Sequence, residues 1–149
     1  MEDQISEERA TFLAQDYSRG FIKYCQFQTE SIHRGRFQSR VDIQPHHRQQ
    51  DGFIHAGVMA TMADHTAGYS AFTIVSEDYQ ILTIEFKINF LRPGYGDALI
   101  CDSRVIREGK QIIISESEVF DVKGETRTLA AKAMVTLMAV HKDRLSSKG

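Results

Sequence analysis

The sequence has 149 residues, a length that suits one domain with a substantial hydrophobic core. Hydrophobic residues make up 42% of it and charged residues 26%, and the net charge of −2 argues against nucleic acid or an anionic membrane as a partner. The two cysteines form no CxxC pair, which disfavours a disulfide framework. No apolar run reaches the roughly 18 residues of a membrane span, and the acidic N-terminus does not resemble a signal peptide. A cytoplasmic location is therefore predicted.

The first part of the chain predicts a helix followed by a hairpin. Residues 5–18 show a helical pattern with Ser6 as its N-cap. Residues 21–31 and 35–43 are predicted to be two paired strands joined by the turn "IHRG". Pro45 ends the second strand, and "QPHHRQQDG" is predicted to be a loop.

The rest of the chain predicts one long helix and four strands. The helix is expected over residues 56–75 and the strands over 79–91, 97–108, 111–122 and 126–140. Gly-containing turns between these strands predict that consecutive strands are antiparallel neighbours. Because a helix that is apolar nearly all round must be covered on most sides, we expect an α+β fold. Its curved antiparallel sheet would wrap around this central helix, with an additional N-terminal helix, in a single domain over residues 1–149.

One carboxylate, Asp64, interrupts the long apolar helix. Burying a carboxylate costs several kcal/mol unless it is paired, hydrogen-bonded or protonated. Asp64 is therefore either a capped or salt-bridged acid of the core, or a poorly solvated general base or nucleophile. His65, the next residue, points about 100° away around the helix, so the two side chains cannot share one reacting atom.

The segments "IHAGVMATMADHTAGYSA" and "TIEFKINFLRPGYGD", in this order of elements, resemble the hotdog-fold acyl-CoA thioesterases. The similarity covers about residues 20–140 and is strongest to the phenylacetate-pathway (PaaI-like) branch. It rests on His-x-Gly, an Asp nine residues after that His, and a strand ending in Phe-x-x-Pro, while Ala56 stands where the family usually has Gly. The resemblance implies a hotdog fold, a homodimer or dimer of dimers, and an acyl-CoA substrate with an aromatic or medium-chain acyl group. It implies no cofactor, since coenzyme A is part of the substrate.

The same resemblance assigns roles to residues of the helix and its approach. Asp64 would activate water or attack the thioester carbonyl itself. The N–H groups of Ala56 and Gly57, at the positive end of the helix dipole, would stabilise the oxyanion. His55 is expected mainly to anchor the loop. Because Asp64 lies about 12 Å along the helix from Ala56, we expect each site to combine residues of two chains.

Three further assignments follow from position. Gln49, with Gln50 as its competitor, would orient the thioester or the water, although a loop amide can also be ordinary surface. Thr83 would hold the catalytic water, although Thr is common in strands. Arg92, Arg107 and Lys110, like Lys123, flank turns and could pair with the phosphates of coenzyme A, or be solvated charges.

Other site types find less support. The cluster of His46, His47, His55, Asp64 and His65 lacks the His-x-x-x-His spacing that places two ligands on one helical face, so no metal site is predicted. Two other functions remain open on the same fold. A non-catalytic acyl-CoA sensor would not need Asp64, and a hydratase or dehydratase would need a different helix signature.

Overall fold

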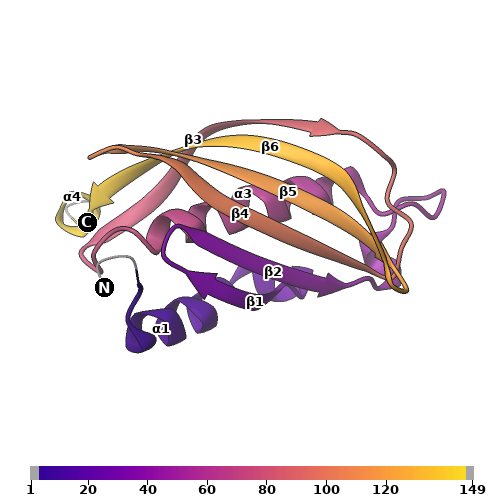
Figure 1. Cartoon of the computed structure of the whole chain (residues 1–149), viewed down its shortest axis with the longest axis horizontal. Helices are drawn as coiled ribbons and strands as arrows, with labels where there is room; N and C mark the ends of the chain where they lie inside the picture. Colours follow the sequence, from indigo (N-terminus) through magenta and orange to yellow (C-terminus); the bar gives the residue numbers. More distant parts are fainter. Residues whose placement is uncertain (1–3, 147–149) are drawn as a thin grey trace.

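Six antiparallel strands form one sheet in the order β1-β2-β4-β5-β6-β3 in the computed structural model, which describes residues 4–146 (Figure 1). The strands are β1 (Gln28–His33), β2 (Arg36–Asp42), β3 (Tyr79–Phe90), β4 (Ala98–Glu108), β5 (Ile112–Lys123) and β6 (Thr126–His141). The helices are α1 (Glu7–Tyr17), α2 (Phe21–Cys25), α3 (Ala56–Phe72) and α4 (Lys142–Ser146), with a 3-10 turn η1 (Pro45–His47). No helix in this described part is long and apolar enough to cross a membrane.

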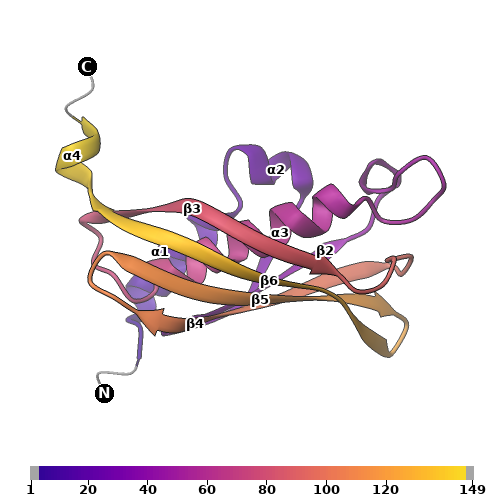
Figure 2. The same cartoon turned by 90° about the horizontal axis from the view of Figure 1, so that it is seen from above.

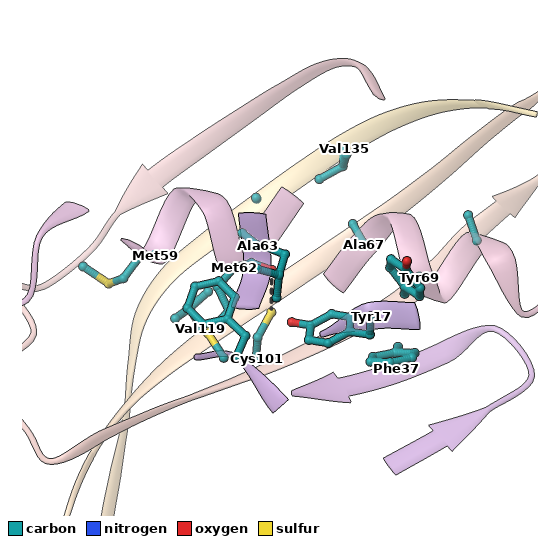
Figure 3. Close-up of a cluster of buried hydrophobic side chains, with 14 of the residues drawn as sticks. Tyr17, Phe37, Met59, Met62, Ala63, Ala67, Tyr69, Cys101, Val119 and Val135 are labelled. Atoms are coloured by element: carbon teal, nitrogen blue, oxygen red, sulfur yellow. Dashed lines mark hydrogen bonds between the residues drawn. The ribbon is translucent and has the colours of Figure 1, made fainter. Parts of the chain in front are cut away.

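The central helix α3 lies along the inner face of the curved sheet, as predicted (Figures 1 and 2). Small residues such as Ala63 and Ala67 are fully buried, which lets the helix approach the sheet closely, and Met62 fills the space between them and the strands (Figure 3). The helix ends at Phe72, three residues before the predicted end. Thr73 terminates it because its hydroxyl donates to the Ser70 carbonyl (2.6 Å) and accepts from the Gly35 N–H (2.7 Å).

Helix α1 matches the prediction for residues 5–18, including the Ser6 cap, whose hydroxyl accepts from the Arg9 N–H at 3.1 Å. The end of α1 is fastened to α3. The buried Tyr17 hydroxyl is hydrogen-bonded to that of Thr66 at 2.9 Å. Its ring stacks on Phe37 with centroids 4.9 Å apart (Figure 3). The N-terminal helix is therefore part of the core, not an appendage.

The prediction of a strand from residue 21 is wrong, because residues 21–25 form the helix α2. Gly20 and Gln26 flank this helix with φ of 60° and 65°. Two residues with positive φ so close together prevent an extended chain from running through the segment. Strand β1 begins only at Gln28, and from there its pairing with β2 is confirmed.

The prediction that β3 and β4 are neighbours is also wrong, although the β4–β5 and β5–β6 hairpins are confirmed. Residues 91–97 cross over the ends of β6 and β5 to reach β4. The first two N–H groups of this crossover donate to the Ala130 carbonyl, and the Gly96 N–H donates to the Asp121 carboxylate at 2.9 Å. A Cβ at Gly96 would lie 2.2 Å from the Val122 carbonyl oxygen. The glycine therefore serves a close backbone approach, not a hairpin turn.

The loop before α3 is built around a buried histidine. The His47 Nδ1 accepts from the Gln44 N–H at 2.9 Å, so Nε2 carries the proton that it donates to the Cys25 carbonyl at 2.7 Å. Burial lowers the pKa of His47 below its usual value. The ring can therefore make both bonds only while it is neutral, because a protonated Nδ1 could not accept from the Gln44 N–H.

We expect the free energy of unfolding to fall as the pH drops below about 6.5, the ordinary pKa of histidine in the unfolded chain. At pH values between about 6.5 and the lowered pKa in the folded protein, the unfolded state binds more protons than the folded state. Each such histidine then lowers the free energy of unfolding by up to about 1.4 kcal/mol for each pH unit of acidification. His65, whose pKa burial also lowers, adds to the effect. Urea titrations between pH 5 and 8 measure it. The variant His47→Gln should flatten the slope, and an unchanged slope in a folded His47→Gln protein would contradict this account.

Candidate active site

Asp64 lies half-buried on the side of α3 that faces β3, not in the core between helix and sheet. The Thr83 hydroxyl donates to its Oδ1 at 2.8 Å, which orients the carboxylate. A β-bulge interrupts the β3–β6 register between Thr83 and Glu85. Such bulges re-aim side chains, and this one places Thr83 and Phe86 opposite Leu137 and Val135, two inward-facing residues of β6.

Two cavities meet at Asp64. One of about 370 Å³ also involves α2 and β3; its lining is Arg19, Phe21, Ile22, Ala60, Thr61, Asp64, His65 and Phe86. The other, of about 210 Å³, is lined by Asp64, His65, Gly68, Tyr69, Phe72, Gln80, Ile81 and Thr83. The carboxylate is thus exposed to a partly apolar cavity on each side, a setting suited to a base or nucleophile.

The His65 side chain points away from Asp64, as its position around the helix predicts, and contacts the end of α1. Its Nε2 donates to the Tyr17 carbonyl at 2.9 Å, and its ring lies 4.5 Å from that of Tyr17. Burial lowers the pKa of His65, so the ring is neutral near pH 7. Asp64 therefore has Thr83, and not His65, as its hydrogen-bond partner.

The two amides at the start of α3 differ in availability. His55 is the N-cap, and its Nδ1 accepts from the Gly57 N–H at 2.8 Å. A Cβ at Gly57 would lie 2.9 Å from that nitrogen, so the glycine permits the cap. The Ala56 N–H has no partner within residues 4–146. Of the two predicted oxyanion donors, Ala56 is the open one.

Gln49 lines the same cavity as Ala56. Its Oε1 accepts from the Asp51 N–H, while its Nε2 has no hydrogen-bond partner in the described part of the chain. A cavity of about 460 Å³ brings these groups together; its lining is Gln49, Gln50, Phe53, Ile54, His55, Ala56, Met59, Phe90, Leu91, Arg92 and Pro93. Gln49 and Ala56, which both line this cavity, thus each have an N–H group without a partner among the described residues.

One chain does not unite the two groups of predicted residues. Asp64 and Thr83 line one set of cavities, and Gln49, His55 and Ala56 line another. Along α3 their separation is about 12 Å, whereas a base acts within about 3 Å of its target.

The three predicted phosphate-binding residues are divided as well. Arg92 lines the cavity of Gln49, just beyond the end of β3. Arg107 and Lys110 lie at the β4–β5 turn, at the opposite end of the sheet, where Lys110 shares a cavity with Tyr79 at the start of β3 (Figure 1). A single chain therefore cannot offer all three to one coenzyme A phosphate.

Strand β3 pairs with β6 along one edge, and its other edge pairs with no strand among the described residues. Large apolar side chains of this strand are exposed: Leu82, Ile84, Phe86 and Phe90. An open apolar edge of this length invites pairing with another strand. The described residues contain no group of three or more His, Cys, Asp or Glu side chains placed to hold a metal ion.

Residues 51–128 match the sequence model of the Thioesterase superfamily. The chain belongs to this superfamily. A protein of Saccharolobus solfataricus provisionally named an esterase is 29% identical over 90% of this chain and 91% of its own length. The 1,4-dihydroxy-2-naphthoyl-CoA hydrolase of Listeria monocytogenes is 25% identical over 76% of this chain and 89% of its own. A thioesterase family protein from Silicibacter pomeroyi has a TM-score of 0.85 at 26% identity, covering 89% of this chain and 98% of that one.

These thioesterase matches confirm the hotdog fold. The superfamily match includes His55, Ala56, Asp64 and Thr83 but excludes α1 and α2. Cavity residues that the motifs did not reveal are Phe21, Ile22 and Phe86. For Phe86 the one available signal was the alternation in "ILTIEFKINF", which puts Phe86 on the same strand face as Ile88 and Phe90.

Proposed function

We propose that this protein hydrolyses an acyl-CoA thioester to a free acid and coenzyme A. The proposal is carried by the half-buried Asp64, oriented by the Thr83 hydroxyl beside an apolar cavity, in a chain of the thioesterase superfamily. The Listeria relative is named as the hydrolase of an aromatic acyl-CoA, which supports this substrate class. The PaaI-like branch, an aromatic or medium-chain acyl group and a cytoplasmic location remain part of the proposal.

In the proposed reaction Asp64 takes a proton from water as the water oxygen attacks the thioester carbon. The Ala56 N–H and the Gln49 amide hold the negative charge that develops on the carbonyl oxygen, a contribution of about 3 kcal/mol per donor in known oxyanion holes. The carbon–sulfur bond then breaks, and the proton on Asp64 passes to the departing thiolate. Alternatively, Asp64 attacks the carbonyl directly, and water hydrolyses the mixed anhydride.

The proposed site is assembled by two chains. Antiparallel pairing of two β3 edges across a two-fold axis would cover the exposed apolar residues of β3 and bring the start of one α3 toward the middle of the other. The same pairing would place Arg92 of one chain near the Tyr79 end of its partner's β3, where the partner's Lys110 lies. The open edge of β3 and the division of site residues between cavities both support a homodimer, alone or paired into a dimer of dimers.

The test of the function is a panel of acyl-CoA thioesters with free thiol release as the readout. We expect hydrolysis of aromatic or medium-chain acyl-CoA by the wild-type protein. Binding of acyl-CoA without thiol release would indicate a sensor instead, and hydration of an unsaturated acyl-CoA would indicate a hydratase.

We expect the affinity for coenzyme A to fall by about threefold between 50 and 500 mM salt, because exposed Arg and Lys side chains would pair with its phosphates. Calorimetric titration measures the dissociation constant. Arg92→Gln should weaken binding at low salt and reduce this dependence, with Lys23→Gln, on α2, as the control. An affinity that is independent of salt would exclude Arg92, Arg107 and Lys110 as phosphate-binding residues.

A further inference from the structure

Helix α2 is a short element held at both ends and lies beside α3 (Figure 2). At its end, the Cys25 carbonyl accepts from His47 Nε2 at 2.7 Å. Before it, the Ser18 hydroxyl donates to the Phe27 carbonyl at 3.0 Å, which closes the segment into a loop. Ile22 is only 3% exposed and belongs to the core. Because α2 lies outside residues 51–128, nothing in the superfamily match specifies its side chains.

Two aromatic side chains from different elements reach the cavity at Asp64. Phe21 comes from α2 and Phe86 from β3, and both are exposed in the single chain. From α3 the cavity receives the short side chains of Ala60 and Thr61, which leave room for a ligand. Since Ile22 is packed in the core, the cavity cannot deepen past it without disturbing the fold.

Apart from Asp64, the lining offers little charge to an acyl group. Arg19 pairs with Asp16 at 3.2 Å, and its side chain is mostly exposed at the rim. His65 donates to the Tyr17 carbonyl. An uncharged group bounded by aromatic rings therefore fits this cavity best, since aromatic pairs gain from offset-stacked or edge-to-face contact.

We propose that α2 selects the acyl group: Phe21 and Phe86 bind a planar aromatic acyl group next to Asp64, and Ile22 limits its length. The inference rests on the proposed thioesterase function and narrows its substrate class to aryl-CoA thioesters. Long aliphatic chains are disfavoured because they lack ring contacts and meet the packed core at Ile22.

The experiment compares kcat/KM for benzoyl-CoA, phenylacetyl-CoA, hexanoyl-CoA and decanoyl-CoA. We expect the wild-type protein to prefer the two aryl substrates. Phe21→Ala should lower their kcat/KM by about tenfold, the effect of one lost ring contact and its apolar area, while decanoyl-CoA is unaffected or improved. Phe21→Leu keeps bulk but loses the ring, so its kcat/KM for the aryl substrates should fall between the values of wild type and Phe21→Ala. Tyr24→Ala is the matched control, because Tyr24 lies on the same helix, is 81% exposed and does not line the cavity.

The outcomes separate the two proposals. Wild-type activity that favours decanoyl-CoA, or the same acyl profile in Phe21→Ala and Tyr24→Ala, would overturn the role of α2 and leave the thioesterase function standing. A wild-type protein that is inactive on all four thioesters would overturn both. Circular dichroism and thermal melting of each variant exclude loss of fold as the cause.

Discussion

Asp64→Asn is expected to lower kcat for thioester hydrolysis by at least about a hundredfold while the protein remains folded. Asn keeps the shape of the side chain and can still accept the hydrogen bond from Thr83, but it can neither take a proton from water nor attack a carbonyl, and such a base contributes at least about 10² to a rate. Steady-state assays of thiol release, with thermal melting of the same samples, measure both effects.

Thr83→Val provides a graded comparison for this substitution. It removes the hydroxyl that orients the carboxylate and leaves the carboxylate itself, so a smaller loss, about tenfold, is expected. Near-normal turnover in a folded Asp64→Asn protein would sink the catalytic assignment. If that protein were also more stable than wild type, Asp64 would instead be a strained acid without a catalytic role.

Mixing Asp64→Asn and Gln49→Ala proteins, each nearly inactive alone, is expected to restore about a quarter of wild-type activity. At equal amounts, about half of the refolded dimers contain one chain of each kind. In such a dimer one site combines the intact Gln49 of the first chain with the intact Asp64 of the second, and the other site has neither. Thiol release from co-refolded samples measures the recovery, and native mass spectrometry shows the mixed dimers.

A double variant, Gln49→Ala with Asp64→Asn in one chain, supplies the control. It is co-refolded with an equal amount of wild type and compared with wild-type protein at the same total concentration. If sites are shared between chains, about a quarter of the activity should remain, because both sites of each mixed dimer are defective. If each site lay within one chain, about half would remain. That value, or no recovery in the first mixture, would place the whole site in one chain.

The composition of the longer segments predicted most of the fold. The apolar composition of α3 and the β-branched and apolar composition of β5 and β6 led to the correct elements within a few residues. Helix α2 escaped prediction because "FIKYC" has the residues of a strand, and the left-handed conformation of Gln26 has no sequence signal. The crossover was misread as a turn between neighbouring strands, because the sequence does not distinguish a glycine that serves a turn from one, such as Gly96, that serves a close backbone approach.

The sequence selected candidate residues for the site but could not place their atoms. Spacing selected Ala56 and Gly57 together, yet only the direction of the His55 ring decides which amide remains open. Spacing also linked Asp64 to the helix start without showing that β3, through Thr83, is its nearest partner. Contacts between distant segments, such as that of Phe21 with the cavity at Asp64, depend on the folded chain and leave no local pattern.

The crossover of residues 91–97 has a consequence for the order in which the protein acquires its site. The Ile54 N–H donates to the Gly94 carbonyl at 2.7 Å, and the His55 N–H donates to the His47 carbonyl at 2.9 Å. The backbone that presents the open Ala56 amide is therefore held by a residue of the crossover, about 40 positions further along the chain. Because closing such a long loop costs more entropy than forming a hairpin, we expect the β4–β5 and β5–β6 hairpins to form before this amide is held in position. The ability to bind a substrate carbonyl then depends on the crossover, and not on helix α3 alone.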